Sequence, residues 1–174
     1  LCGQRPFRAG ALGKLLRQVV QSTPEPLRDV RPEVPEELGE IVARARQAGV
    51  GAMVTISMRV RQFDRYRDIA EAHEDVYFTV GTHPHVAHEE LDIPAEQIAA
   101  LAQHPRCVGI GEAGLDYYYK NSTPQAQAAG LRTHIAAARQ TGLPLGIHTR
   151  DADDDTASIL EEEMRKGAFK VALK

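Results

Sequence analysis

Hydrophobic positions follow two alternating patterns from residue 35 to the end of the chain. Short apolar runs rich in β-branched residues are typical of buried parallel strands. Between them, apolar residues recur every three or four positions, which is typical of amphipathic helices. The runs predict strands at 52–56, 76–80, 107–110, 144–147 and 171–173. The helical spacing predicts helices from Pro35 to Gly49, through 63–70, through 98–102, from Pro124 to Gly142, and from Asp151 to Gly167.

Strands that alternate with helices through short connections indicate a parallel sheet with right-handed crossovers. A doubly wound sheet and a TIM-type (β/α) barrel both satisfy this α/β pattern. Glycine-rich loops of the GxGxxG or GxxxxGK[ST] type, which bind nucleotide phosphates, follow none of the predicted strands. Because polar groups gather at the strand ends, as described below, we expect a partial TIM-type (β/α) barrel.

Residues 1–34 differ in character from the rest of the chain. They carry six basic and three acidic side chains, and the apolar cluster within 12–20 has helical spacing. Three prolines between 24 and 32 then interrupt any continuation of that helix. We therefore expect an atypical N-terminal segment at 1–34, a helix plus a linker, and one barrel domain at 35–174. Since the sequence starts at Leu1 rather than Met, we also expect an incomplete or misassigned N-terminus, in preference to the organelle transit segment that basic residues without acids in 1–24 would suggest.

The composition narrows the classes of function. The 174 residues and 43% hydrophobic content are enough for one domain with a hydrophobic core. With 21 basic and 24 acidic side chains, the chain lacks the cationic excess of polybasic nucleic-acid-binding proteins. Nucleic acid as the substrate of a metal site stays open, since bound cations supply positive charge. Two cysteines without CxxC spacing favour a reduced, intracellular setting, and no apolar run is long enough to span a membrane.

Three of the predicted strands lead into unusual polar segments. The strand at 76–80 is followed by GTHPH, the strand at 107–110 by GEAGLDY, and the strand at 144–147 by HTRD. In a (β/α) barrel the carboxyl ends of neighbouring strands share one mouth. We therefore expect the polar groups of these three segments to converge.

Glu112 and His148 are the candidates for a metal site. Glu112 stands among small residues, and a buried, unpaired carboxylate is costly, so a nearby cation would stabilise it. Neutral imidazole, as at His148, is a common ligand of zinc-like metals. The alternatives are a Glu112 carboxylate that pairs with an arginine or caps a helix, and a His148 ring satisfied within the core. His134, beside the inward stripe of its helix, is assigned to packing.

His83 and His85 flank Pro84, which is expected to hold both on an extended segment. They could bind metal, bind phosphate, or cap the next helix. Asp116 and Arg150 could orient a ligand, since a guanidinium group matches phosphate through two hydrogen bonds. An internal Asp116–Arg150 salt bridge would explain both residues without any substrate.

Taken together, three segments resemble the TatD family of metal-dependent deoxyribonucleases. They are GTHPH at 81–85, GIGEAGLDYYY at 109–119 and LPLGIHTRDADDD at 143–155. The resemblance runs from about residue 35 to 174. It implies a (β/α) barrel that hydrolyses DNA phosphodiester bonds, often as a 3′–5′ exonuclease, with one or two divalent cations (Mg²⁺, Mn²⁺ or Zn²⁺). It also implies a cytoplasmic protein with DNA as its substrate and no membrane association.

The resemblance implies roles for individual residues of this chain. Glu112 matches the metal-bridging carboxylate of the family, and His148 matches a histidine ligand. His83 and His85 match the segment near the substrate phosphate. The implied set is catalytic residues Glu112, Asp116 and Arg150, substrate-binding residues His83, His85, Tyr117 and Arg150, and metal ligands Glu112 and His148.

The chain also departs from the family pattern. The first strand of the family carries a His-x-His pair, whereas no histidine precedes His73 here. The family also has an HCF-type motif with a metal-binding histidine and an ETD-type motif with an aspartate, and the given sequence ends at Lys174 before either motif. We therefore expect an incomplete copy, with a catalytically impaired fragment or pseudoenzyme as the alternative to an active hydrolase. A related barrel hydrolase with another substrate is a further alternative, although such enzymes usually carry lysine where Glu112 stands. Open barrel edges would favour self-association.

Overall fold

The computed structural model describes residues 38–173 of the chain. The described residues fall into two units, which divide between residues 50 and 51. The predicted helix and linker at 1–34, and the predicted domain boundary after residue 34, lie outside the described residues. That division of the chain therefore stays a prediction.

One described helix, α3 (Leu38–Gln47), belongs to the first unit. It carries Glu40 in its first turn and Arg44 and Arg46 in its last turn, which is the distribution of charge that the helix dipole favours. Gly49 follows with a φ of 87°. This left-handed conformation suits the glycine that was predicted to end the helix.

The second unit contains a five-stranded parallel sheet. Its strands are β1 (Met53–Thr55), β2 (Val76–Val80), β3 (Cys107–Asp116), β4 (Leu145–Arg150) and β5 (Val171–Leu173). They are connected by α4 (Phe63–Ala72), α5 (Ala95–Leu101), α6 (Pro124–Thr141) and α7 (Asp153–Lys166), with short 3₁₀ helices η1 (Val60–Gln62) and η2 (Pro84–Glu89).

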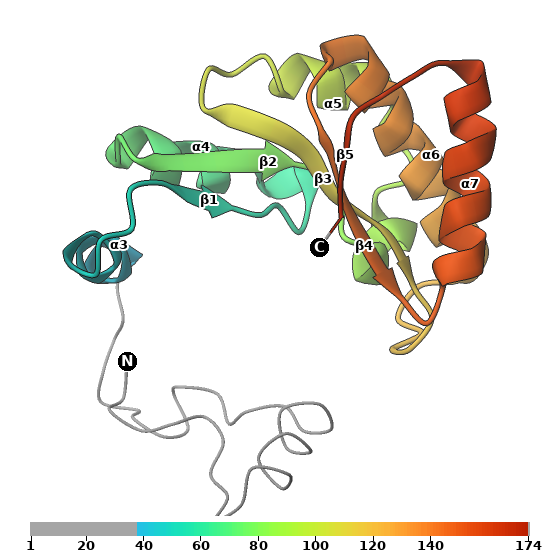
Figure 1. The fold of residues 1–174 in the computed structure, drawn as a ribbon, viewed down its shortest axis with the longest axis horizontal. Helices are drawn as coiled ribbons and strands as arrows, with labels where there is room; N and C mark the ends of the chain where they lie inside the picture. The colour runs from blue at the N-terminus through green and yellow to red at the C-terminus, as the bar shows by residue number, and fades with distance from the viewer. Residues whose placement is uncertain (1–37, 174) are drawn as a thin grey trace, which may run out of the picture. The chain divides into compact units, whose positions relative to one another are not determined.

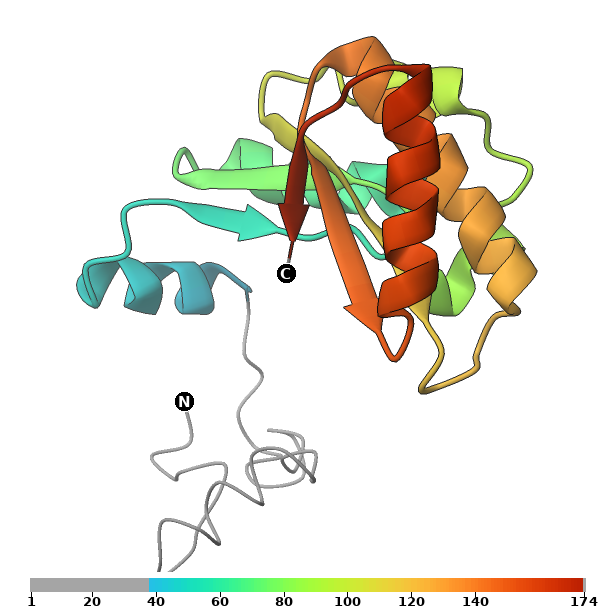
Figure 2. The same cartoon turned by 45° about the vertical axis from the view of Figure 1, so that its right-hand side comes forward.

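The order of the strands distinguishes the two folds that the sequence allowed. Neighbouring strands follow one another as β1-β2-β3-β4-β5, with no strand skipped. Right-handed crossovers then place the connecting helices on one side of the sheet, whereas a doubly wound sheet reverses its order and carries helices on both faces. Figures 1 and 2 show α5, α6 and α7 together on one side of the curving sheet. This is the architecture of part of a TIM-type (β/α) barrel, as predicted.

The core of this unit lies between the sheet and its helices. Phe78, Ile110 and Leu145 from three strands, and Leu131 and Ile135 from α6, are fully buried. Burial of each such side chain stabilises the folded state by roughly 1.5–3 kcal/mol relative to exposure. Because α6 packs along β3, it holds the strand that carries two of the polar candidates.

Helices α6 and α7 begin and end close to the predicted positions. Thr123 caps α6 by accepting a hydrogen bond from the Ala126 N–H (3.2 Å), and Gly142 ends the helix with a φ of 71°. Helix α7 begins at Asp153 rather than Asp151, because Asp151 has a φ of 53° and stands before the helix. In the described part of the chain, no helix is both long and apolar enough to cross a membrane.

Three strands differ from the prediction, one of them β4, which continues past Ile147 to Arg150. β3 does not end at Ile110 but continues to Asp116, paired with β4. Glycine allows this close pairing, because a Cβ at Gly114 would lie 1.9 Å from the carbonyl oxygen of His148. Small residues in place of an apolar run concealed this half of the strand. β1 is less buried than predicted, with Val54 49% exposed, since it lies at the edge of the sheet.

Candidate functional site

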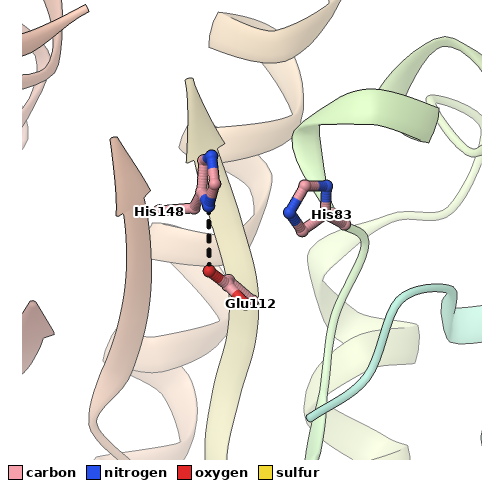
Figure 3. Close-up of side chains that lie close together, drawn as sticks. All are labelled: His83, Glu112 and His148. Carbon is pink, nitrogen blue, oxygen red and sulfur yellow. Dashed lines mark hydrogen bonds and ion pairs between the residues drawn. The ribbon is translucent and has the colours of Figure 1, made fainter. Parts of the chain in front are cut away.

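The polar candidates meet toward the carboxyl ends of β2, β3 and β4, as the sequence predicts. Glu112 and Asp116 lie on β3, His148 lies on β4, and His83 lies in the segment that follows β2. Glu112, Asp116 and His83 are buried. Figure 3 shows His83, Glu112 and His148 directed toward one another from three different elements. The parallel sheet therefore gathers groups that are far apart in the sequence.

His83 caps the 3₁₀ helix η2, one of the roles considered for it; its own backbone is extended as predicted, but Pro84 and His85 belong to the helix. Pro84 opens the helix, and Nδ1 of His83 accepts a hydrogen bond from the His85 N–H (3.2 Å). The two rings meet edge to face with centroids 4.4 Å apart. Because Nδ1 accepts a hydrogen bond, the neutral ring of His83 carries its proton on Nε2. It therefore presents a donor to the site.

Glu112 and His148 make a direct carboxylate–imidazole contact. Nδ1 of His148 lies 3.1 Å from Oε1 of Glu112. The other ring nitrogen, Nε2, lies 3.0 Å from Oδ2 of Asp116. A neutral imidazole carries one N–H, so one of its two nitrogens then faces a carboxylate oxygen with its lone pair. Such a contact is favourable only with a proton or a cation between the two atoms.

Asp116 is the shared acceptor of the site and is 1% exposed. Its Oδ2 accepts from Nε2 of His85 (2.8 Å) as well as from His148. Its Oδ1 accepts from the N–H groups of Tyr118 and Tyr119, both at 3.0 Å. Burial alone would raise the pKa of Asp116, but these hydrogen bonds outweigh it and lower the pKa to about 2. Asp116 is therefore ionised at neutral pH and orients both imidazoles.

The ring of His83 carries no charge at neutral pH. Burial, followed by the neighbouring imidazoles of His148 and His85, lowers the pKa of His83 to about 4. A neutral ring adds no positive charge beside Glu112 and Asp116. The site therefore does not repel a cation through His83.

The spacing of the possible metal ligands at this site fits a divalent cation. One nitrogen or oxygen atom from each of His83, Glu112 and His148 lies within 4.8 Å of the other two. Because Nδ1 of His83 accepts from the His85 N–H and its Nε2 carries the proton, Glu112 and His148 are the two that can offer a lone pair. Two metal–ligand bonds of about 2.1 Å at a tetrahedral angle separate their donor atoms by about 3.4 Å. The 3.1 Å between Nδ1 of His148 and Oε1 of Glu112 is close to that spacing. Asp116, on the other nitrogen of His148, is the kind of carboxylate partner that orients metal-bound imidazoles.

Ser57, which sequence reasoning missed, connects the backbone segments of the site. Its hydroxyl donates to the Gly81 carbonyl (2.7 Å), and its N–H donates to Oγ1 of Thr79 (3.0 Å). Its carbonyl accepts from the N–H of Glu112 (3.4 Å). Ser57 is 1% exposed. A single serine after a predicted strand has no distinguishing pattern, so no sequence signal could have found it.

A second buried network fixes the loop between β2 and η2. The N–H of Thr82 donates to Nε2 of His134 (2.9 Å), and the Thr82 hydroxyl donates to Glu90. The Glu90 carboxylate also accepts from the N–H groups of Val60 (2.9 Å) and Arg61 (3.1 Å). The predicted packing role of His134 is therefore incomplete, because this buried ring also holds the loop through a hydrogen bond.

Arg150 lies at the rim of the site, at the end of β4. Its guanidinium carbon lies 4.1 Å from the centroid of the Tyr118 ring and 4.9 Å from that of Tyr119. The Asp116–Arg150 salt bridge considered above does not form between these two described residues, because Asp116 is engaged by imidazoles and backbone N–H groups. Arg150 is exposed and available to a ligand.

Tyr117 lies in the turn after β3, and its hydroxyl is already engaged. It donates to Oδ2 of Asp155 on α7 at 2.7 Å. Burial, together with this hydrogen bond, raises the pKa of Tyr117 to about 12. The hydroxyl therefore stays protonated at neutral pH and fastens the turn to α7, and a direct contact with substrate stays a prediction for this residue.

Comparison with known proteins gives a family assignment. Residues 29–173 match the model of the family described as TatD related DNase. The chain is 35% identical over 127 residues to the 3′–5′ ssDNA/RNA exonuclease TatD of Klebsiella pneumoniae (strain 342), covering 73% of this chain and 48% of the relative. It is 33% identical over 127 residues to the uncharacterized metal-dependent hydrolase YabD of Bacillus subtilis (strain 168), covering 73% and 50%. The chain therefore spans about half the length of these curated relatives.

Solved structures agree with the assignment. YjjV, a TatD homologue from Escherichia coli K12, superposes with a TM-score of 0.66 at 27% identity, covering 75% of this chain and 52% of that one. A TatD family hydrolase from Entamoeba histolytica shares the fold with a TM-score of 0.67 at 23% identity, covering 76% and 47%. The motifs, the strand order and these matches lead to one conclusion: the chain belongs to the family of TatD-related DNases.

Proposed function

We propose that this chain is a metal-dependent hydrolase that cleaves phosphodiester bonds of single-stranded DNA from the 3′ end. The observation that carries the proposal is the contact between Nδ1 of His148 and Oε1 of Glu112, oriented by Asp116 and facing His83. The names of the relatives support it, since one is an exonuclease acting on single-stranded DNA and RNA and another is a metal-dependent hydrolase.

Glu112 and His148 would hold one Mg²⁺, Mn²⁺ or Zn²⁺ ion, and the family resemblance implies one or two such ions. When bound, such an ion supplies Lewis-acid stabilisation of charge on phosphoryl oxygens and a water of lowered pKa. Asp116 keeps the ring proton of His148 on Nε2, so that the lone pair of Nδ1 points toward Glu112. In our proposal, Asp116 is therefore a positioning residue.

The groups around this pair bind and orient a phosphate. His83 offers its Nε2–H as a donor, and Arg150 offers a guanidinium group at the rim. His85 is held by Asp116 at 2.8 Å next to His83. Donors that are fixed in advance stabilise the negative charge that develops on phosphoryl oxygens without reorganising during the reaction.

The setting of the protein is part of the same proposal. A cytoplasmic location is supported by the family resemblance and by Cys107, which is a buried free thiol. Self-association through the sheet edges at β1 and β5 stays a prediction, based on the unpaired backbone groups that edge strands present.

A 5′-labelled single-stranded oligonucleotide tests the proposal directly. With the full chain and Mg²⁺, Mn²⁺ or Zn²⁺, we expect products that shorten progressively from the 3′ end. EDTA, Glu112→Gln and His148→Gln should each abolish the shortening. Glu161→Gln, which changes an exposed carboxylate on α7, is the matched control and should retain it. No metal-dependent shortening by the wild-type chain would contradict the proposal and favour the catalytically impaired alternative.

A further inference from the structure

Tyr118, Tyr119 and Arg150 form an exposed group at the rim of the site, which we call the Tyr–Arg cluster. The guanidinium of Arg150 stacks over both rings, at 4.1 Å and 4.9 Å from their centroids. The two rings meet edge to face at 4.8 Å. Tyr118 is nevertheless 56% exposed and Tyr119 is 47% exposed. Aromatic surface therefore stays open to solvent beside the guanidinium.

The cluster is held in place although it is exposed. The N–H groups of Tyr118 and Tyr119 both donate to Oδ1 of Asp116 at 3.0 Å. The N–H of Tyr117 donates to the carbonyl of Arg150 at 3.0 Å, which joins the turn to the end of β4. Rigid aromatic side chains lose little conformational entropy when a flat ligand stacks on them. The fold gains little burial from these rings, yet it fixes their backbone.

The cluster also borders the groups that would bind phosphate. The ring of Tyr119 lies 5.1 Å from that of His85, and the ring of His85 lies 4.4 Å from that of His83, centroid to centroid. A flat surface and phosphate-binding donors are therefore neighbours, as a base and a phosphate are neighbours in a nucleotide. Arg150 serves both, since a guanidinium plane stacks on bases and its N–H groups bind phosphate.

We propose that the Tyr–Arg cluster is a stacking platform for a nucleobase of a single-stranded nucleic acid. This inference rests on the function proposed above and adds the subsite that holds a base. Bases in a duplex are already stacked and paired, whereas an unpaired base presents a free face to aromatic and guanidinium groups. Stacking of this kind tolerates any base, which suits an enzyme that moves along a strand.

Negative charge near the cluster weakens the attraction of phosphate, so we expect stacking to contribute the larger part of the binding free energy. The first turn of α7 carries Asp153, Asp154 and Asp155, and Asp155 is hydrogen-bonded to Tyr117 next to the cluster. These carboxylates disfavour a second phosphate contact. With Arg150 as the single positively charged phosphate contact of the described site, we expect the logarithm of the binding constant to fall with the logarithm of salt concentration with a slope of about −0.7.

Binding of oligonucleotides to the full chain in EDTA tests the inference without cleavage. The probes are a labelled single-stranded deoxyoligonucleotide and an abasic strand of equal length, measured by fluorescence anisotropy. We expect the wild-type chain to bind the strand with bases about 10-fold or more tightly than the abasic strand, as base–aromatic stacking implies. The double variant Tyr118→Ala, Tyr119→Ala should bind both strands equally. The double variant Tyr118→Phe, Tyr119→Phe should restore the preference, because it keeps the ring faces.

A matched control and a spectroscopic signal separate stacking from loss of structure. Tyr77 stacks with Arg106 at 5.5 Å at the start of β2, at the opposite end of the strand from the site, so Tyr77→Ala should keep the base preference. The chain contains no tryptophan. Tyr119→Trp therefore introduces a single tryptophan, which can be excited selectively over the tyrosines, and we expect its emission to be quenched by the strand with bases and not by the abasic strand.

The outcomes distinguish this inference from the proposed function. A wild-type chain that binds both strands equally, or binds neither, overturns the inference, as does an alanine double variant that keeps the base preference. Metal-dependent cleavage without a base preference would leave the proposed function standing and remove the platform. A base preference that depends on Tyr118 and Tyr119, without metal-dependent cleavage, would support the platform and contradict the proposed function.

Discussion

Two regions of the second unit bury carboxylates and neutralise them differently. The first, which we call the Glu163 cluster, joins α6 and α7. Glu163 is 5% exposed and accepts from Arg132 (2.8 Å), Arg139 (2.7 Å) and Lys166 (2.8 Å). All three partners carry a permanent positive charge at neutral pH. This cluster is complete in itself, and its role is to hold two helices together.

The second region is the strand-end site, where Glu112 and Asp116 face the imidazoles of His148 and His85. An imidazole is positive only when it is protonated, and the buried ring of His83 stays neutral. The comparison teaches that burial and hydrogen bonding alone do not mark a functional site. The distinguishing feature is that the carboxylates of the strand-end site face imidazoles, whose charge depends on protonation, whereas Glu163 faces permanently charged side chains.

The largest effect is expected at the Glu163 cluster. Glu163→Ala should lower the free energy of unfolding by about 3 kcal/mol, because it removes the carboxylate of the partly buried Arg139 and leaves Arg132 with Glu162 alone. Urea unfolding measures the change. Glu161→Ala, at an exposed position of the same helix, should change it by less than about 0.5 kcal/mol. Equal effects of the two substitutions would contradict a structural role for Glu163.

Added metal should stabilise the protein through the strand-end site and not through the Glu163 cluster. At a Mn²⁺ concentration of about 100 times the dissociation constant, the wild-type chain should gain about 2.7 kcal/mol in free energy of unfolding. Glu112→Gln should remove this gain, since it removes a charged ligand. Glu163→Gln should keep it, because the Glu163 cluster offers no place to a cation. Thermal or urea unfolding with and without Mn²⁺ measures the gain in each variant. A gain that is lost in Glu163→Gln and kept in Glu112→Gln would contradict the assignment of the metal site to Glu112.

A smaller effect is expected where orientation, rather than ligation, is changed. Asp116→Asn should weaken metal binding about 10- to 100-fold, as removal of a partner of a ligating histidine typically does. The cause is the loss of the carboxylate that fixes the Nε2 proton of His148. Titration calorimetry gives the dissociation constant. Asp64→Asn, which changes an exposed carboxylate on α4, should leave it unchanged, and equal affinity in Asp116→Asn would refute the positioning role.

The smallest effect is a dependence of stability on pH. Burial alone would raise the pKa of Glu163, but hydrogen bonds from Arg139, Lys166 and Arg132 outweigh it and lower the pKa from 4.5 to about 2. A lowered pKa in the folded state means that this stabilisation is complete above about pH 4.5 and is lost as the pH falls toward 2. We expect a loss of about 1 kcal/mol between pH 6 and pH 4. Glu163→Gln should flatten that part of the profile, and an unchanged slope would count against this assignment.

Much of the fold could be predicted from the sequence, because apolar periodicity reports burial directly. The strand at 76–80 and the helix from Pro124 to Gly142 were placed correctly in this way. The second half of β3 could not be, since Gly111 and Gly114 replace apolar side chains where strands approach closely. Close backbone approach leaves no hydrophobic pattern, so this segment resembled a loop.

The residues of the candidate site were also only partly predictable from the sequence. Glu112 and His148 could be named because charged and imidazole groups stand out beside apolar strands. Ser57 and Tyr119 could not, because their roles depend on distances across the sheet that a single sequence does not encode. The three consecutive tyrosines at 117–119 were the one available signal for the rim. Their different environments, one engaged by Asp155 and two exposed, required the structure.

The central claim is that one cation lies between Glu112 and His148. Long-range ¹H–¹⁵N spectra of the imidazoles, recorded during a titration with Zn²⁺, test it most directly, with His148→Gln identifying the resonances. We expect Nδ1 of His148 to report metal binding while Nε2 stays protonated, and we expect Glu112→Gln to abolish the change. A His148 ring that does not respond to saturating Zn²⁺, or that responds equally in Glu112→Gln, would contradict the account.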